Sequence, residues 1–96
     1  MGLLGIFRRK QANTEAARRA RLLRTGRIAE GTVIDIGNDA QGTVTHIFYS
    51  YEINGVEYES SQSLEDDQLA RPAAYAPGAH VTIRYDPRQP ANSVVV

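Results

Sequence analysis

The chain has 96 residues, enough for one domain near the lower limit for a self-sufficient hydrophobic core. It contains no cysteine, which excludes disulfides and thiolate metal sites. The formal net charge is zero, but opposite charges are separated along the chain. Residues 1–27, here called the basic arm, hold eight basic residues against Glu15 alone, a net charge of +7. Residues 28–96, here called the body, hold three arginines against ten carboxylates, a net charge of −7.

The N-terminal apolar run "GLLGIF" is far shorter than the roughly 20 residues that span a bilayer. A signal peptide would place its basic residues before the apolar stretch, whereas "RRK" follows it here. Residues 14–25 are predicted to form a helix with a thin apolar stripe of Ala16, Ala20 and Leu23, with Ala17 and Leu22 nearby. Because alanine buries little area, this helix is expected to dock weakly on the body or to fray. Whether the helix extends back through "GLLGIFRRKQ" stays open, because two glycines disfavour it.

From Ile28 onward the pattern is typical of β-structure, with strands predicted at residues 27–37, 43–53, 56–62, 80–86 and 92–96. The alternation of the first strand is imperfect, with Ala29, Gly31 and Val33 on one face but Ile34 and Ile36 on the other. A bulge near Gly31 or burial on both faces would explain this. Residues 63–72 read as a short helical turn capped by Ser63 and ended by Pro72. The predicted fold is mainly β: a small five-stranded antiparallel barrel or curled sheet, similar to OB or SH3 barrels, with an N-terminal basic α-helix. Residues 1–27 form the basic arm with this helix, and residues 28–96 form the barrel.

The stretch "FYSYEINGVEYESSQS" predicts a β-hairpin, because Asn54-Gly55 suits the two central residues of a type I′ turn. That turn sets Tyr51 opposite Tyr58 and Tyr49 opposite Ser60. Period-two alternation then gives one apolar face, made of Ile47, Tyr49, Tyr51, Ile53, Val56 and Tyr58. This face is too apolar for water, so the tyrosines are predicted to form a wall of the core.

The other face of the hairpin carries Glu52, Glu57 and Glu59, with Glu52 opposite Glu57. Two interpretations remain open for this patch. It is either a solvated face that discourages edge pairing, or a docking site for the arginines of the basic arm or Arg84.

The segments "TVIDI", "YSYEINGVEYESS" and "YAPGAHVTIRYDPRQPANSVVV" resemble the bacterial "domain of unknown function 3592" family, over roughly residues 28–96. The family pattern is similar to G-x-V, then Y-x-Y-x-x-x-G-x-x-Y, then G-x-x-V-x-V-x-Y-D-P-x-x-P. The matching positions are Gly31, Val33, Tyr49, Tyr51, Gly55, Tyr58, Gly78, Val81, Ile83, Tyr85, Asp86, Pro87 and Pro90, and Asn54 completes the hairpin turn. The resemblance implies framework residues and no catalytic ones. Many relatives place transmembrane helices beside this domain, which implies a membrane-proximal role, although "MGLLGIFRRK" lacks the length of a spanning helix.

The sequence is compatible with three classes of function to different degrees. The first is a non-catalytic module held to an anionic membrane surface or a protein partner by its basic arm, on the cytoplasmic side of the cell membrane. The residues predicted to insert are Leu3, Leu4, Ile6 and Phe7, and those predicted to meet anionic groups are Arg8, Arg9, Lys10, Arg18, Arg19, Arg21 and Arg24. Self-association is a further prediction, through the open edge of the terminal "VVV" strand.

The second function is nucleic-acid binding, with the arginine-rich helix on phosphates; the acidic body and inward aromatics argue against it. The third is an enzyme, which the sequence disfavours. His46 and His80 have no metal-ligand spacing, and Glu65-Asp66-Asp67 lacks the alternation of a calcium loop. No catalytic residue, metal or cofactor is predicted.

Overall fold

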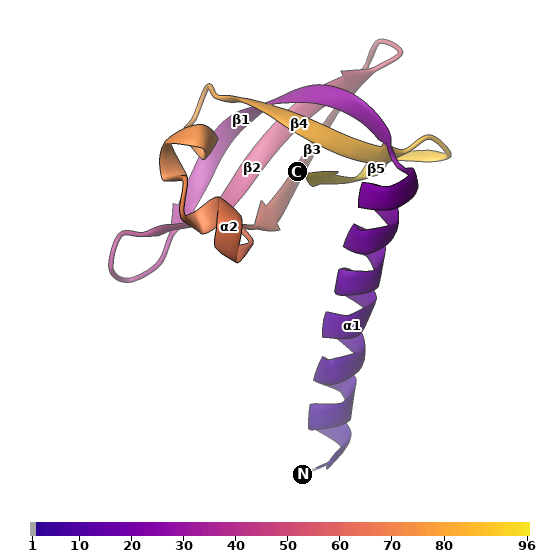
Figure 1. The fold of residues 1–96 in the computed structure, drawn as a ribbon, viewed down its shortest axis with the longest axis vertical. Coiled ribbons are helices and arrows are strands. Elements are labelled where there is room, and N and C mark those ends of the chain that lie inside the picture. Colours follow the sequence, from indigo (N-terminus) through magenta and orange to yellow (C-terminus); the bar gives the residue numbers. More distant parts are fainter. Residues whose placement is uncertain (1) are drawn as a thin grey trace.

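A computed structural model describes residues 2–96 of the chain, with side chains described from Thr14 onward (Figure 1). The elements are α1 (Gly2–Thr25), β1 (Arg27–Asn38), β2 (Val44–Ile53), β3 (Val56–Ser63), α2 (Asp66–Leu69), the 3-10 helix η1 (Pro72–Tyr75), β4 (His80–Asp86) and β5 (Gln89–Val95). The strands form one antiparallel sheet in the order β3-β2-β1-β4-β5. The sheet curls until its edge strands β3 and β5 come together, so the predicted small barrel with an N-terminal helix is confirmed.

The central strand β1 contains the bulge that the sequence indicated, but not at the predicted position. Its register against β2 slips between Val33 and Asp35, so the bulge lies at Ile34 and not near Gly31. The Asp35 carboxylate accepts a hydrogen bond of 2.8 Å from the Ile36 backbone N–H, which stabilises this irregular backbone locally. The slip leaves Ile34 and Asp35 both exposed and returns Ile36 to the core side.

The β2–β3 hairpin has the register predicted from Asn54-Gly55. Tyr51 pairs with Tyr58, and Tyr49 pairs with Ser60. Asn54 and Gly55 have φ angles of 52° and 82°, as a type I′ turn requires. Two residues of local turn chemistry therefore decide which face of the hairpin turns inward.

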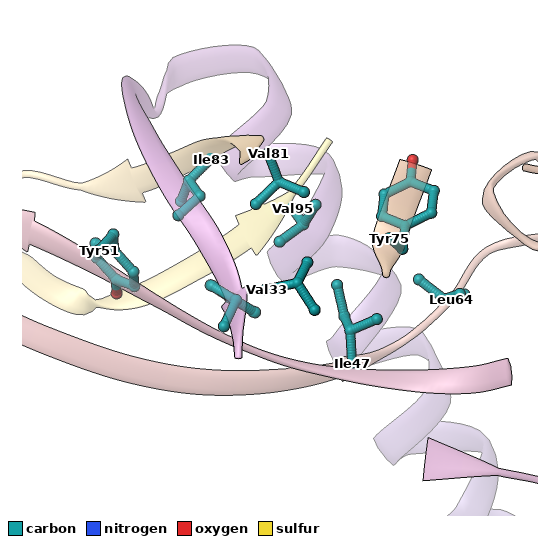
Figure 2. Close-up of a cluster of buried hydrophobic side chains, with 9 residues drawn as sticks. Val33, Ile47, Tyr51, Leu64, Tyr75, Val81, Ile83 and Val95 are labelled. Atoms are coloured by element: carbon teal, nitrogen blue, oxygen red, sulfur yellow. The ribbon is translucent and has the colours of Figure 1, made fainter. Parts of the chain in front are cut away.

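The inward face of the barrel contains the predicted tyrosine wall. Tyr49 and Tyr51 are buried, and Tyr58 is half-buried with its ring 5.5 Å from that of Tyr51. Figure 2 shows Val33, Ile47 and Val95 meeting from different strands, with Leu64 and Tyr75 beside them. Val56 was predicted to share this face but is exposed, because it lies at the hairpin tip next to the turn.

The connection between β3 and β4 differs from the predicted single helical turn. Ser63 is the last residue of β3 and does not cap a helix; Glu65 caps α2, in a reciprocal capping box with Gln68. Pro72 opens η1, where its missing N–H costs no helical bond. The terminal strand also begins earlier than predicted, at Gln89, and includes Pro90.

We expect Gly31→Ala to lower the free energy of unfolding by about 1–3 kcal/mol, the usual cost of overpacking. A Cβ atom at this position would lie 2.8 Å from the Ser50 carbonyl oxygen and would collide with the Ile83 side chain. Urea denaturation measures the loss. Gly37→Ala is the matched control on the same strand, because its Cβ would meet only the Cβ of His46, at 3.2 Å. Equal losses for the two variants would contradict the close packing at Gly31.

Candidate binding surfaces

The helix α1 contacts the barrel through fewer apolar side chains than the sequence indicated. Leu22 is 3% exposed, whereas Leu23, predicted to face the body, is 37% exposed. Ala16 and Ala20 are exposed as well. The predicted apolar stripe is therefore wrong, and one leucine anchors the C-terminal end of the helix.

Two arginines predicted for anionic surfaces instead hold α1 to the body. Arg18 Nη1 donates to Asn92 Oδ1 at 2.7 Å and to the Ser93 carbonyl oxygen at 3.1 Å. Arg19 Nε lies 3.1 Å from Glu65 Oε1, and its Nη1 donates to the Val95 carbonyl oxygen at 3.3 Å. Arg21 and Arg24 are exposed, as an interaction with an external anion requires.

The side chain of Arg18 also bonds back along its own helix. Its Nε and Nη2 donate to the two carboxylate oxygens of Glu15 at 3.0 and 2.7 Å, in a fork-like geometry. These hydrogen bonds lower the pKa of the Glu15 carboxyl and raise the pKa of Arg18. The pair therefore stays ionised at neutral pH and orients the guanidinium toward β5.

The seam between the edge strands β3 and β5 is joined by side chains. The Gln62 amide accepts from the Val95 N–H at 2.8 Å and donates to the Val95 carbonyl oxygen at 3.3 Å. The fully buried Gln68 donates to the same oxygen at 3.1 Å. The predicted open edge of the terminal strand is therefore occupied at Val95 within a single chain.

A groove of about 470 Å³ runs beside this seam, between α1 and the end of β3. Its lining includes Arg18, Arg19 and Glu65. Because both guanidinium groups are engaged by Glu15, Asn92, Glu65 and backbone oxygens, the groove offers little free positive charge to an anionic ligand.

The two interpretations of the Glu52–Glu57 patch can be compared over the described side chains. Arg19 reaches Glu65 on the body, and Arg84 Nη1 donates to the Gly26 carbonyl oxygen at 2.9 Å. Between residues 14 and 96, no Lys or Arg forms an ion pair with Glu52, Glu57 or Glu59. Part of the basic arm thus docks on the acidic body, but away from the hairpin.

The predicted insertion residues Leu3, Leu4, Ile6 and Phe7, and the basic residues Arg8, Arg9 and Lys10, lie outside the described side chains. Their backbone belongs to α1, which starts at Gly2 and so extends well before residue 14. Figure 1 shows this part of α1, residues 2–13 and here called the distal half, projecting away from the sheet.

The remaining signature residues build the framework. The hydroxyl of Tyr49 lies 2.8 Å from Ser93 Oγ, and the hydroxyl of Tyr51 donates to the Pro90 carbonyl oxygen. Both bonds tie the tyrosine wall to β5. Asp86 accepts a 2.8 Å hydrogen bond from the Arg88 N–H in the turn that leads into β5, and Gly78 occupies a turn with φ of 91°.

The structure also brings each histidine to a polar partner that sequence reasoning missed. His46 Nδ1 lies 3.2 Å from Ser63 Oγ across β2 and β3, and His80 Nδ1 lies 3.4 Å from Glu30 Oε1. Both pairs follow from strand register, because His46 sits opposite Ser63, and His80 sits opposite Thr32 beside Glu30. The predicted hairpin register implied the first pair, because it sets His46 opposite Ser63, whereas the second pair needed the pairing of β1 with β4.

Comparison with known proteins decides the family. A family model described as "Domain of unknown function (DUF3592)" matches residues 24–96, which include the whole barrel and the last two residues of α1. The chain belongs to the DUF3592 family. The predicted family membership is thereby confirmed. No curated protein and no solved structure matches the chain. Among the described residues of this DUF3592 chain, no helix is both long and apolar enough to cross a bilayer.

The tyrosine wall of this DUF3592 barrel predicts a loss of stability at alkaline pH. Burial raises the pKa of Tyr51, so the folded state holds the phenol proton more tightly than the unfolded chain. The resulting stability is complete below the unfolded pKa of about 10 and falls as the pH rises through the folded pKa. Tyr51→Phe should lose about 1 kcal/mol at neutral pH with its bond to Pro90, yet lose less than the native chain on going to about pH 11. Urea unfolding at both pH values checks this, and identical pH-dependent losses in the two proteins would refute it.

The α1 junction predicts that Arg18→Ala and Arg19→Ala each weaken the docking of the helix by about 1 kcal/mol. Hydrogen exchange of the α1 amides in residues 18–25 should then be roughly fivefold faster, because the helix separates more often from β5. Arg21→Ala is the matched control, since Arg21 is exposed on the same helix. Unchanged exchange in both junction variants would show that Leu22 alone holds the helix.

Proposed function

We propose that this DUF3592 chain is a non-catalytic β-barrel module that binds anionic membrane surfaces through the distal half of α1. The observation that carries the proposal is the continuity of α1 from Gly2 to Thr25, with one end fixed to the barrel and the other projecting from it. The twelve helical residues of the distal half, at 1.5 Å each, extend about 18 Å beyond the part of the helix that is anchored. The helix is thus a short stalk that presents "GLLGIFRRK" at a distance from the acidic body.

The electrostatic design supports a surface rather than a pocket as the target. Arg18 and Arg19 are used in anchoring, so the residues left for lipid headgroups are Arg8, Arg9, Lys10 and the exposed Arg21 and Arg24. A basic residue near an anionic surface contributes about 1 kcal/mol. Each large apolar side chain inserted beside them adds about 1 kcal/mol or more. Binding of this kind is reversible and weakens with salt.

The positive flank favours the cytoplasmic face of the cell membrane, where anionic lipids concentrate. An acidic protein surface offers the same charge and is the other class of partner that the arm suits. In the test below, comparing binding to anionic and to neutral vesicles distinguishes the effect of lipid charge from that of apolar insertion.

The nucleic-acid alternative has less support. Phe48 is the exposed aromatic side chain of the described sheet, and Asp35 and Glu59 line the same hollow of the surface. Carboxylates beside a stacking residue repel phosphates, whereas proteins that bind single strands surround such residues with positive charge.

The non-catalytic part of the proposal rests on how the polar side chains are used. His46 and Ser63 are cross-strand neighbours on the outside of the barrel, and the Glu30–His80 pair is largely exposed. A general base gains its power from burial and an orienting partner inside a cleft. The buried Tyr49 and Gln68 instead form structural bonds to β5.

Vesicle co-sedimentation tests the function with full-length chains. The native chain should pellet with anionic vesicles at low salt and stay in the supernatant with neutral vesicles. A triple variant, Arg8→Glu with Arg9→Glu and Lys10→Glu, should lose at least about 100-fold in partitioning, because three favourable charges become repulsive. The matched control is Arg88→Glu, which changes one charge on the body.

A native chain that ignores anionic vesicles at low salt would end the membrane proposal. Partitioning that is equal for the native chain and the triple variant would assign binding to another surface. Retention by neutral vesicles as well would show that insertion of the apolar residues alone is sufficient.

A further inference from the structure

The outer face of the sheet contains an apolar hollow that the barrel does not use. It has a volume of about 490 Å³ and is lined by Ile34, Asp35, Phe48, Glu59, Ser60 and Ser61. Ile34 is 46% exposed and Phe48 is 40% exposed, although both are large apolar side chains. They come from neighbouring strands, since Asp35 is opposite Phe48 in the β1–β2 pairing.

The β1 bulge creates this hollow. A bulge re-aims a side chain and locally strengthens the strand twist. Here the slip leaves two successive side chains, Ile34 and Asp35, on the outside, so that an apolar group and a carboxylate lie together beside Phe48. The Asp35–Ile36 hydrogen bond of 2.8 Å supports that arrangement.

The surroundings of the hollow are acidic. Asp35 and Glu59 line it, and Glu52 faces Glu57 further along the same side of the hairpin. Glu30 on β1 meets only the weakly basic His80 among the ion pairs formed by residues 14–96. Two exposed apolar side chains, Ile34 and Phe48, beside the carboxylates of Asp35 and Glu59 fit a segment that carries large apolar side chains next to Lys or Arg.

The chain itself contains such a segment. Residues 3–10 read "LLGIFRRK", four large apolar side chains followed by three cations. They lie in the distal half of α1, which projects away from the sheet of its own chain (Figure 1). Because Arg18, Arg19 and Leu22 fix the direction of the helix, the segment cannot fold back onto its own outer face while the helix is intact.

We propose that the hollow formed by Ile34 and Phe48 binds the distal half of α1 of a second copy of this chain. The carboxylates beside the hollow of one molecule then meet Arg8, Arg9 and Lys10 of another, while Arg18 and Arg19 stay paired within their own chain. A contact between two different surfaces leaves an unused arm and an unused hollow at the ends, so association grows with concentration. This surface is distinct from the one proposed to meet lipid, although both use the same arm.

Sedimentation equilibrium of the full chain at low salt tests the proposal. The weight-average mass should rise above that of one chain with increasing concentration and return toward it at high salt. Phe48→Asp, at an exposed position, should weaken association by at least about tenfold, since it adds a charge to the apolar floor. Ile28→Asp is the matched control: Ile28 is 65% exposed but lies outside the hollow, and this variant should associate like the native chain.

A mixing experiment identifies the two surfaces. The Phe48→Asp chain keeps its arm, and the triple variant Arg8→Glu, Arg9→Glu, Lys10→Glu keeps its hollow, so each alone should remain a single chain. Mixed together, they should form a complex of two chains. A native chain that stays single at every concentration, or a mixture that does not associate, would overturn the proposal.

The membrane function and the self-association inference can be refuted independently of each other. Phe48→Asp should still bind anionic vesicles, because it leaves the arm unchanged. A native chain that binds anionic vesicles but stays single at every concentration would sink only this inference. A native chain that self-associates but ignores anionic vesicles would sink only the membrane function.

Discussion

Closure of this barrel depends on one carbonyl oxygen, that of Val95, on which three elements converge. Gln62 from β3, Gln68 from α2 and Arg19 from α1 all donate to it, at 3.1 to 3.3 Å. Val95 is completely buried, so an unpaired carbonyl there would carry the cost of desolvation without compensation. The Gln62 side-chain amide also accepts a hydrogen bond from the Val95 N–H. It therefore makes the same pair of hydrogen bonds to Val95 that a residue of a neighbouring antiparallel strand would make. A side chain thus completes the sheet where backbone pairing between β3 and β5 is lacking.

The hydrogen bonds around Val95 also help to determine the direction of α1. Arg19 donates to the Val95 carbonyl oxygen and pairs with Glu65. Arg18 binds β5 earlier along the strand, at the Asn92 side chain and the Ser93 carbonyl oxygen. Leu22 is buried one helical turn after these arginines. The contacts of Arg18, Arg19 and Leu22 with the barrel therefore leave α1 little freedom to rotate. The backbone of the distal half then extends away from the sheet (Figure 1). Barrel closure and arm presentation are therefore consequences of one set of bonds.

Local chemistry explains which parts of the structure the sequence could predict. Asn54-Gly55 determines a turn type, the turn type determines register, and register determines that the tyrosines face inward. The position of the bulge at Ile34 was harder to predict. A break in the alternation of apolar and polar residues shows that the strand register slips, but not at which residue. Its place depends on the tight packing of Gly31 under Ile83 and on the Asp35 side chain, which only three dimensions reveal. Gln62 and Gln68 gave no signal at all: their partner lies 33 and 27 residues away, and isolated glutamines read as surface residues.

The separation of charge connects the two proposed roles of the arm. A chain of zero net charge has no long-range repulsion to keep copies apart, and its opposite poles attract at distances up to a Debye length, about 8 Å at physiological salt. Anionic lipid and the acidic hollow of a second copy present the same sign of charge to the same residues. One arm can bind only one of them at a time, so membrane binding and self-association are linked equilibria. Conditions that favour binding of the arm to a membrane also reduce occupation of the hollow. Because Asp35 and Glu59 line the hollow, anionic lipid would repel it, so an emptied hollow stays available to a basic and apolar segment in solution.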